Sequence, residues 1–174
     1  MRIIAGEYRS RKLKSVPGLE VRPTPDRLRE ALFNVLAPRI AGSIFVDAYA
    51  GSGAVGLEAL SRGAKRVILI ERKQAAIEII RENVASLGTG KDAVSVVRGQ
   101  AGVLLANFPA DIVFIDPPYE LVAEYTLALN AVAATPCELA IAQHTSRVTL
   151  DEAYGKLSKT RVLKQGDNSL SFYS

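Results

Sequence analysis

The chain has 174 residues, of which 48% are hydrophobic, a length and composition that suit one compact domain with a sizeable core. It contains no apolar run of about eighteen residues and starts without the apolar segment of a secretory signal, which argues against a membrane span and favours a cytoplasmic protein. A single cysteine, Cys137, and a single histidine, His144, argue against an internal disulfide and against a metal site.

The net charge of +4 is unevenly distributed along the chain. Residues 1–40 carry nine basic and four acidic side chains, whereas the remainder carries thirteen basic and fourteen acidic ones, so the excess positive charge is N-terminal. Such an asymmetry suggests a polyanionic partner. The alternative is a solvated basic surface, which is the favoured reading for a charge run taken alone.

The N-terminal section predicts a hairpin followed by a helix. Residues 2–16 alternate loosely and indicate a short β-hairpin, with Gly6 at a turn or bulge. Thr24 is the expected N-cap of the helix, Pro25 its first residue and Pro38 its end. Its apolar face is formed by Leu28, Ala31, Leu32, Val35 and Leu36, with Arg27 and Arg29 elsewhere on the helix.

After Gly42, short apolar runs alternate with helical patterns. The expected strands are residues 44–48, 67–71, 94–98, 111–115 and 139–143, and the expected helices are about 53–62, 73–87, 101–107 and 121–134, with C-cap glycines at 63 and 88. Crossovers between Val/Ile-rich strands imply a parallel sheet covered on both faces. Residues 156–174 predict an antiparallel hairpin around Gly166 at the sheet edge. The expected fold is therefore α/β, a doubly wound, mostly parallel, seven-stranded sheet with an N-terminal hairpin extension.

The first chemical motif is DAYAGSGAVG, which begins at Asp47. Its glycines let backbone pass close to a ligand at a helix N-terminus. Glu71 ends the next strand twenty residues after Gly51, a spacing at which an acid accepts hydrogen bonds from a ribose. The loop matches G-x-G-x-x-G, and NAD is one candidate. Asp47 favours S-adenosylmethionine instead, because a pyrophosphate is disfavoured next to a carboxylate, whereas an amine and a sulfonium are not.

The second motif is FIDPPYE, in which Asp116 follows an expected strand at the ligand-binding edge of the sheet. Pro117 and Pro118 stiffen the loop and remove two backbone donors, which leaves convergent acceptors suited to an exocyclic amino group. Tyr119 offers a flat face on which an extracted base can stack. A proline-rich strand terminator with an exposed tyrosine is the alternative for this motif alone. Its combination with the first motif favours the functional reading.

These motifs resemble those of amino methyltransferases, and the chain as a whole resembles the bacterial 16S rRNA guanine-N2 methyltransferases of the RsmD type. The resemblance rests on RIIAGEYRSRKL, RPTPDRLREALFNVL, DAYAGSGAVGLEALSRGA, DPPY and GDNSLSFY, which span nearly the whole length. It implies a Rossmann-like class I methyltransferase fold, with residues 1–23 as a basic extension and 24–174 as the methyltransferase domain. It also implies methylation of one guanine N2 (position 966 in the usual rRNA count) in 16S rRNA or the assembling 30S subunit, by a monomer without a metal.

The resemblance also implies roles for individual residues, which we state as expectations. Asp47 and the loop Ala50, Gly51, Ser52 and Gly53 would face the methionine part of S-adenosylmethionine, Glu71 its ribose, and Gln100 and Ala101 its adenine. Gln100 and Gln143 stand where an acid is common in relatives. The segment from Asp116 to Tyr119, with both prolines, matches the catalytic loop. The expected RNA-binding residues are Arg9, Arg11, Lys12, Lys14 and Arg22.

The expected reaction is an in-line displacement in which guanine N2 attacks the cofactor methyl group, the bond from sulfur to methyl breaks and S-adenosylhomocysteine leaves. Acceptors at Asp116 and the Pro117 carbonyl would orient N2 and favour the positive charge that develops on it. One alternative is a DNA adenine-N6 or cytosine-N4 methyltransferase, although 174 residues leave little room for a DNA target-recognition domain. The other alternative is a noncatalytic RNA-binding module, which the intact DPPY motif disfavours.

Overall fold

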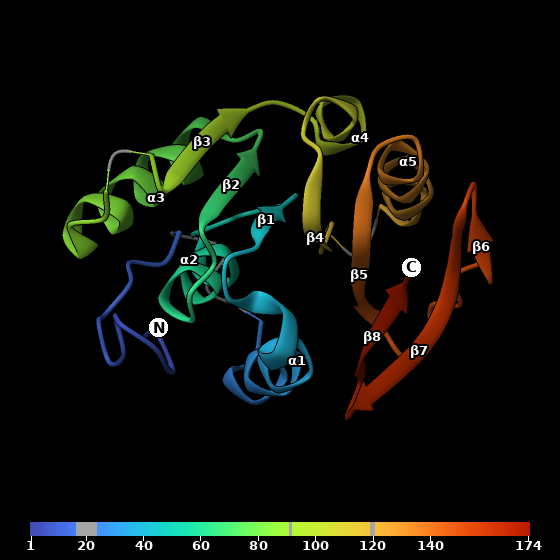
Figure 1. Cartoon of the computed structure of the whole chain (residues 1–174), viewed down its shortest axis with the longest axis horizontal. Helices are drawn as coiled ribbons and strands as arrows, with labels where there is room; N and C mark the ends of the chain where they lie inside the picture. Colours follow the sequence, from blue (N-terminus) through green and yellow to red (C-terminus); the bar gives the residue numbers. More distant parts are fainter. Residues whose placement is uncertain (17–23, 91, 119–120) are drawn as a thin grey trace.

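A computed structural model of the protein describes residues 1–16, 24–90, 92–118 and 121–174. One mixed sheet forms its centre, with strands in the order β3-β2-β1-β4-β5-β8-β7-β6 (Figure 1). The strands are β1 (Ile44–Asp47), β2 (Arg66–Glu71), β3 (Val94–Arg98), β4 (Ala110–Ile115), β5 (Cys137–Thr145), β6 (Ala153–Tyr154), β7 (Leu157–Gln165) and β8 (Asn168–Tyr173). The first five are parallel, and the last three are antiparallel to their neighbours. This sheet confirms the expected doubly wound α/β fold.

Helices cover both faces of the sheet (Figure 1). They are α1 (Asp26–Ile40), α2 (Ala54–Ser61), α3 (Gln74–Leu87), α4 (Ala101–Leu104), followed by the 3-10 turn η1 (Leu105–Asn107), and α5 (Val122–Ala133). Side chains of α1, α2 and α3 belong to one buried cluster, and those of α4 and α5 belong to another on the opposite face. Strands β1, β2, β4 and β5 are mostly buried between the two clusters, which explains why their sequences are rich in consecutive apolar residues.

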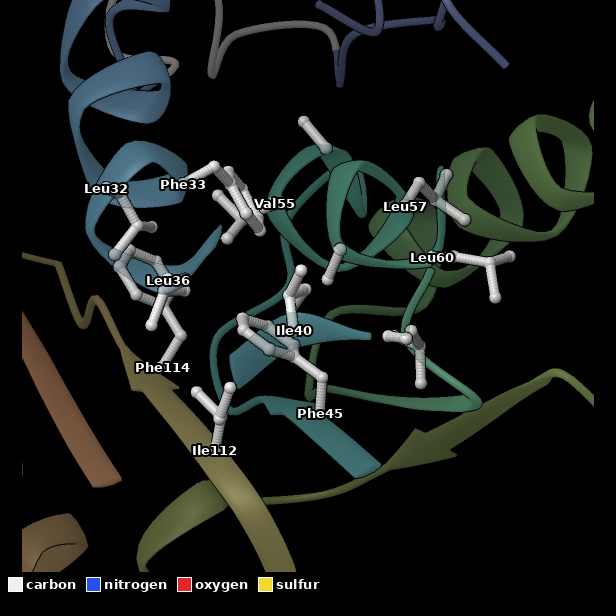
Figure 2. Packing of buried hydrophobic residues seen from close by; sticks show 14 of the residues in the cluster. Leu32, Phe33, Leu36, Ile40, Phe45, Val55, Leu57, Leu60, Ile112 and Phe114 are labelled. Carbon is white, nitrogen blue, oxygen red and sulfur yellow. The ribbon is translucent and has the colours of Figure 1, made fainter. Parts of the chain in front are cut away.

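The buried cluster on the α1 side packs helix α1 against the sheet. Figure 2 shows Leu36 and Ile40 of α1 pointing towards Phe45 of β1 and Phe114 of β4. The rings of Phe33 and Phe45 lie 6.2 Å apart between centroids. These side chains are at most 4% exposed. Burial of each large apolar side chain contributes about 1.5–3 kcal/mol, so the cluster holds α1 firmly against the centre of the sheet.

Three details of the expected fold are wrong. The sheet has eight strands rather than seven, because the two-residue β6 pairs with β7 at the edge. The N-cap of α1 is Pro25 and not Thr24. The helix also continues through Pro38 to Ile40, because a proline near the C-terminus of a helix removes only one hydrogen bond, and the buried Ile40 keeps the last turn packed.

The N-terminal segment folds back on itself as expected, but its ladder is reduced to one antiparallel bridge, between Arg2 and Lys12. The reason is that backbone groups between these residues bind α2 instead of a partner strand. The N–H groups of Ile4 and Ala5 donate to the Glu58 carboxylate at 2.8 and 3.1 Å. Gly6 has a φ of +85°, and a Cβ there would lie 1.8 Å from the Ser61 carbonyl oxygen, so this close approach requires glycine.

Buried charges join this segment to the core. Arg29 and Glu58 are both fully buried, with Nε and Oε2 4.0 Å apart. The Arg29 guanidinium donates to the Arg2 carbonyl at 2.6 Å and to Asp26 at 3.0 Å. Arg62 donates to Glu58 at 2.7 Å. Burial lowers the pKa of Arg29, and the adjacent Glu58 opposes that shift. Arg29 therefore anchors the N-terminal segment and is not a surface charge available to a partner.

Candidate active site

A cleft of about 760 Å³ lies at the carboxyl ends of the parallel strands. Its wall includes residues that follow β1, β2, β3, β4 and β5, together with part of the N-terminal segment. Chain order reverses between β1 and β4, which are neighbours in the sheet. In open α/β sheets the crevice at such a reversal is where ligands bind. The cleft is therefore the candidate active site.

The loop after β1 is tied directly to the acid at the end of β2. The Gly51 N–H donates to Glu71 Oε2 at 3.0 Å, and the other carboxylate oxygen accepts from the N–H groups of Arg72 and Lys73 at 2.9 and 2.8 Å. A carboxylate has about four acceptor sites, so these three bonds orient Glu71 and leave it capacity for a ligand hydroxyl. Both Gly51 and Glu71 line the cleft, as the spacing of twenty residues predicts.

The loop then enters α2 through Gly53, which is the N-cap residue and whose N–H donates to the Ala50 carbonyl at 2.7 Å. Gly53 is buried behind the loop, whereas Ala50, Gly51 and Ser52 line the cleft. The third glycine of the motif, Gly56, has a packing role, because a Cβ there would lie 2.3 Å from the Leu69 side chain. The three glycines of the G-x-G-x-x-G match thus have different roles. Gly51 lies in the open loop, Gly53 is the N-cap residue of α2, and Gly56 allows α2 to pack closely against the sheet.

Asp47 is a buried carboxylate on the floor of the cleft, 2% exposed. Its Oδ2 accepts from the Gly56 N–H at 3.0 Å. Burial, together with the nearby Glu71, raises the pKa of Asp47 to about 7, while the bond from Gly56 opposes the shift. A cationic ligand beside Asp47 would stabilise the ionised carboxylate that burial disfavours.

The end of β3 forms the third part of the cleft. Gln100 is the N-cap residue of α4, and its carbonyl accepts from the N–H groups of Val103 and Leu104 at 3.2 and 3.0 Å. The preceding Gly99 N–H donates to the Glu71 carbonyl at 3.0 Å. Gln100 and the buried Ala101, the two residues expected near the adenine, both line the cleft.

The loop after β4 supplies the opposite side. Asp116, Pro117 and Pro118 line the cleft, with Asp116 half-buried and Pro117 buried. Tyr119, the fourth residue expected in the catalytic loop, lies outside the described residues. The Pro118 carbonyl accepts from the Leu121 N–H at 2.9 Å. The structure thus brings the two sequence motifs together in one cleft, on opposite sides of the β1–β4 reversal.

Sequence reasoning missed several residues that support the site. Tyr49 donates its hydroxyl to Glu124 Oε2 at 2.8 Å, joining the loop after β1 to the start of α5. Asn83 of α3 is 1% exposed and donates to the carbonyls of Ser52 and Lys14 at 2.9 and 3.0 Å. A signal for Asn83 exists, because it is a polar residue on the otherwise apolar face of α3. No such signal marks the Tyr49–Glu124 pair, which only the folded chain brings together.

The four expected RNA-binding side chains that the structure describes lie outside the cleft wall. Arg9 and Lys12 are exposed, whereas Arg11 donates to the Ser86 carbonyl and Lys14 pairs with Glu82 at 2.7 Å. Arg22 lies outside the described residues. The N-terminal segment contributes Met1, Ser15, Val16, Thr24 and Pro25 to the cleft wall instead, while other basic side chains, Arg72, Lys73 and Arg147, lie at the cleft.

The donors and acceptors of the cleft fit S-adenosylmethionine. An oriented carboxylate at Glu71 suits ribose hydroxyls, and a buried carboxylate at Asp47 suits a cation. A Cβ built on Gly51 would meet nothing within 4 Å, so the loop faces open space. In the described parts of the chain, no group of three or more His, Cys, Asp or Glu side chains is placed to hold a metal ion. No helix there is long and apolar enough to cross a membrane.

Comparison with known proteins adds an independent observation. The family described as Conserved hypothetical protein 95 matches residues 1–174. A Bacillus subtilis (strain 168) protein described as "Putative rRNA methyltransferase YlbH" is 33% identical over 99% of this chain and 98% of that protein. "Ribosomal RNA small subunit methyltransferase D" of Escherichia coli (strain K12) is 46% identical, over 68% of this chain and 60% of that protein. A solved structure, "Putative methyltransferase yhhF from Escherichia coli", matches with a TM-score of 0.82 and 38% identity over 99% of this chain and 96% of that chain.

Proposed function

The chain belongs to the Conserved hypothetical protein 95 family, and on that basis we propose that it is an S-adenosylmethionine-dependent rRNA methyltransferase acting on the exocyclic N2 of one guanine in 16S rRNA. The observation that carries this proposal is the shared cleft. The Gly51–Glu71 bond lies on its β1–β2 side and the Asp116–Pro118 loop on its β4 side. A cofactor held on the first side would face an amino group held on the second.

Cofactor binding falls to the first side. The oriented Glu71 accepts hydrogen bonds from the ribose, and the Asp47 carboxylate favours the positively charged methionine part. The adenine lies against Gln100 and Ala101. The N–H of Ala101 is at the start of α4. When bound, S-adenosylmethionine supplies the electrophilic methyl group.

Substrate activation falls to the second side. Asp116 and the Pro117 carbonyl accept hydrogen bonds from the target amino group, which orients its lone pair towards the cofactor. The N2 lone pair of guanine is delocalised into the ring, and these acceptors favour the tetrahedral, positively charged nitrogen that forms during transfer. Two successive prolines restrict φ and keep the loop rigid. The two acceptors are therefore already in place before the base binds, and no conformational entropy is lost in positioning them. Tyr119 stacks on the extracted base.

The polyanion partner is the rRNA itself, free or in the assembling 30S subunit. Exposed Arg9 and Lys12 of the N-terminal segment contact phosphates, which positions the RNA without reading its sequence. Arg11 and Lys14 also hold the segment against α3, so they combine a structural role with any contact to RNA. Division into a basic extension at 1–23 and a catalytic domain at 24–174, a monomeric state and a cytoplasmic location stay predictions.

The proposal is tested by transfer of a labelled methyl group. The purified protein is incubated with labelled S-adenosylmethionine and undermethylated 30S subunits, free 16S rRNA or naked DNA. We expect label in the rRNA and none in DNA. Label in DNA would favour the adenine-N6 or cytosine-N4 alternative, and no transfer to any substrate would favour a noncatalytic RNA-binding module.

The same assay tests the chemistry of the second side. Asp116→Ala should reduce turnover by about 10- to 100-fold, because it removes one hydrogen bond of roughly 1.5–3 kcal/mol to an increasingly charged amino group. Its affinity for S-adenosylmethionine, measured by calorimetry, should stay near that of the wild type. An equal loss of cofactor affinity would assign Asp116 to the cofactor and not to the base.

A further inference from the structure

Gln143 occupies a position in the cleft that the proposed mechanism does not use. It lies near the end of β5, where Ala142 is in register with Ile115, the last residue of β4, so Gln143 lies level with Asp116, the residue that directly follows β4. Adjacent strands of a sheet lie about 4.8 Å apart, so the end of β5 lies close to the loop that follows β4. Both residues line the cleft. Gln143 is thus a neighbour of the proposed base-binding loop.

The side chain of Gln143 is buried, and its amide oxygen, Oε1, has no hydrogen-bond partner among the described residues. The residue is 2% exposed. The next residue on the strand, His144, is equally buried and fully paired, with Nδ1 at 2.8 Å from the Thr145 carbonyl and Nε2 at 2.8 Å from Ser171 Oγ. An unpaired buried acceptor costs roughly 1–3 kcal/mol, so a ligand donor that reached Oε1 would recover that energy.

The backbone around Gln143 is held firmly, which leaves the amide as the adjustable part. Tyr125 of α5 donates its hydroxyl to the Gln143 carbonyl at 2.7 Å, and β5 is paired on both sides, with β4 and β8. The terminal torsion of a glutamine side chain is broad and has low barriers. A rotation about that bond turns Oε1 from the protein towards a donor in the cleft without moving the strand.

The location of Gln143 indicates which ligand supplies that donor. The groups assigned to S-adenosylmethionine follow β1, β2 and β3, whereas Gln143 lies on the β4–β5 side with Asp116. A donor near Gln143 therefore belongs to the target base. Among bases with an exocyclic amino group, guanine alone has an N–H, at N1, next to the carbon that bears the amino group. The equivalent ring nitrogens, N1 of adenine and N3 of cytosine, have a lone pair and no hydrogen.

We propose that Gln143 determines the choice of base, by accepting a hydrogen bond from guanine N1–H through Oε1 while Asp116 holds the adjacent amino group. This inference rests on the proposed function. With an adenine or cytosine amino group in the same place, Oε1 would face a lone pair, which repels it and leaves the acceptor unpaired. A site built to pair with a substrate N–H rejects analogues that lack it far more strongly than an apolar pocket does.

The test uses a substrate that differs at the ring nitrogen and keeps the reacting amino group. In 2-aminopurine the amino group stays on C2, the oxygen on C6 is replaced by hydrogen, and N1 has a lone pair in place of the N–H. We would reconstitute 30S particles with 16S rRNA that carries guanine or 2-aminopurine at the methylated position, and compare kcat/KM for the wild type, Gln143→Leu and Gln143→Glu. Gln165→Leu is the matched control, because Gln165 Oε1 is also unpartnered among the described residues and Gln165 does not line the cleft.

We expect the wild type and the Gln165→Leu control to prefer guanine over 2-aminopurine by about 10- to 100-fold. This fold-change corresponds to the cost of leaving one buried acceptor unpaired. Gln143→Leu should lose that preference through a slower reaction with guanine. Gln143→Glu, which keeps an acceptor, should retain the preference. S-adenosylmethionine affinity and thermal unfolding, measured for each variant, report whether the fold and cofactor site are intact.

Two kinds of failure are distinguishable. If the wild type transfers no methyl group to the guanine particle, the proposed function fails and this inference fails with it. If the wild type is active but treats guanine and 2-aminopurine alike, the assignment of Gln143 alone is overturned, whatever the variants do. It is also overturned if a folded Gln143→Leu protein keeps the wild-type preference, or if Gln143→Glu loses it.

Discussion

Asp47 makes the cofactor-free protein less stable at neutral pH, and Asp47→Asn should remove this effect. Burial raises the pKa of Asp47 to about 7 in the folded state, against 3.8 as the ordinary value. Between these two pKa values the folded state keeps a proton that the unfolded state has released, so stability falls as pH rises through this window. A shift of about three pKa units corresponds to a loss of about 4 kcal/mol, complete above pH 7 and absent below about pH 4.

Asparagine is nearly isosteric and keeps an oxygen to accept the Gly56 N–H, which lies at 3.0 Å from Oδ2 in the wild type. The variant should therefore resemble the wild type near pH 4 and exceed its stability at pH 8. We expect the stability difference between Asp47→Asn and the wild type to grow by about 3 kcal/mol from pH 5 to pH 8. Urea unfolding of the cofactor-free proteins, followed by circular dichroism at each pH, measures this difference. A difference that stays constant across this pH range would refute the assigned pKa and its cause.

Three further predictions concern the cofactor, the base and the RNA. Glu71→Ala should weaken S-adenosylmethionine binding by roughly 1.5–3 kcal/mol for each lost charge-assisted hydrogen bond, and unchanged affinity by calorimetry would remove Glu71 from the ribose site. Tyr119→Ala should reduce turnover more than Tyr119→Phe, because stacking needs the ring and not the hydroxyl, and equal losses would contradict a stacking role. Replacing Arg9 and Lys12 by Ala should reduce the slope of log affinity for rRNA against log salt by about 1.5, with Lys164→Ala on β7 as the control. An unchanged slope would mean that these two charges make no phosphate contact.

The parts of the fold that depend on periodic patterns were predictable from the sequence. The five parallel strands begin and end within two residues of their expected bounds, because strands buried on both faces read as uninterrupted apolar runs. The bond between Gly51 and Glu71 also agrees with the spacing of twenty residues, because a strand–loop–helix–strand unit brings the ends of neighbouring strands together. The local sequence was sufficient to predict a residue's position wherever that position depends only on the helix or strand that contains the residue.

Other features depend on contacts between segments far apart in the chain. Arg29 belongs by composition to a solvated helix face, and only the buried Glu58 and the Arg2 carbonyl explain its full burial. The N-terminal hairpin is reduced to one bridge for the same reason, because the α2 side chain of Glu58 takes the donors that a strand ladder would have used. The Tyr49–Glu124 bond joins residues 75 positions apart, and neither residue stands out in its own segment.

The central claim is that the cleft methylates guanine at N2, and identification of the product nucleoside tests it most directly. After reaction with labelled S-adenosylmethionine, undermethylated 30S subunits are digested to nucleosides, which are separated and identified by mass spectrometry. Our account predicts that the label is found in N2-methylguanosine from a single 16S rRNA position and that Asp116→Ala strongly reduces it. Label in N6-methyladenosine or N4-methylcytidine, or in a guanosine methylated at a ring nitrogen, would contradict it.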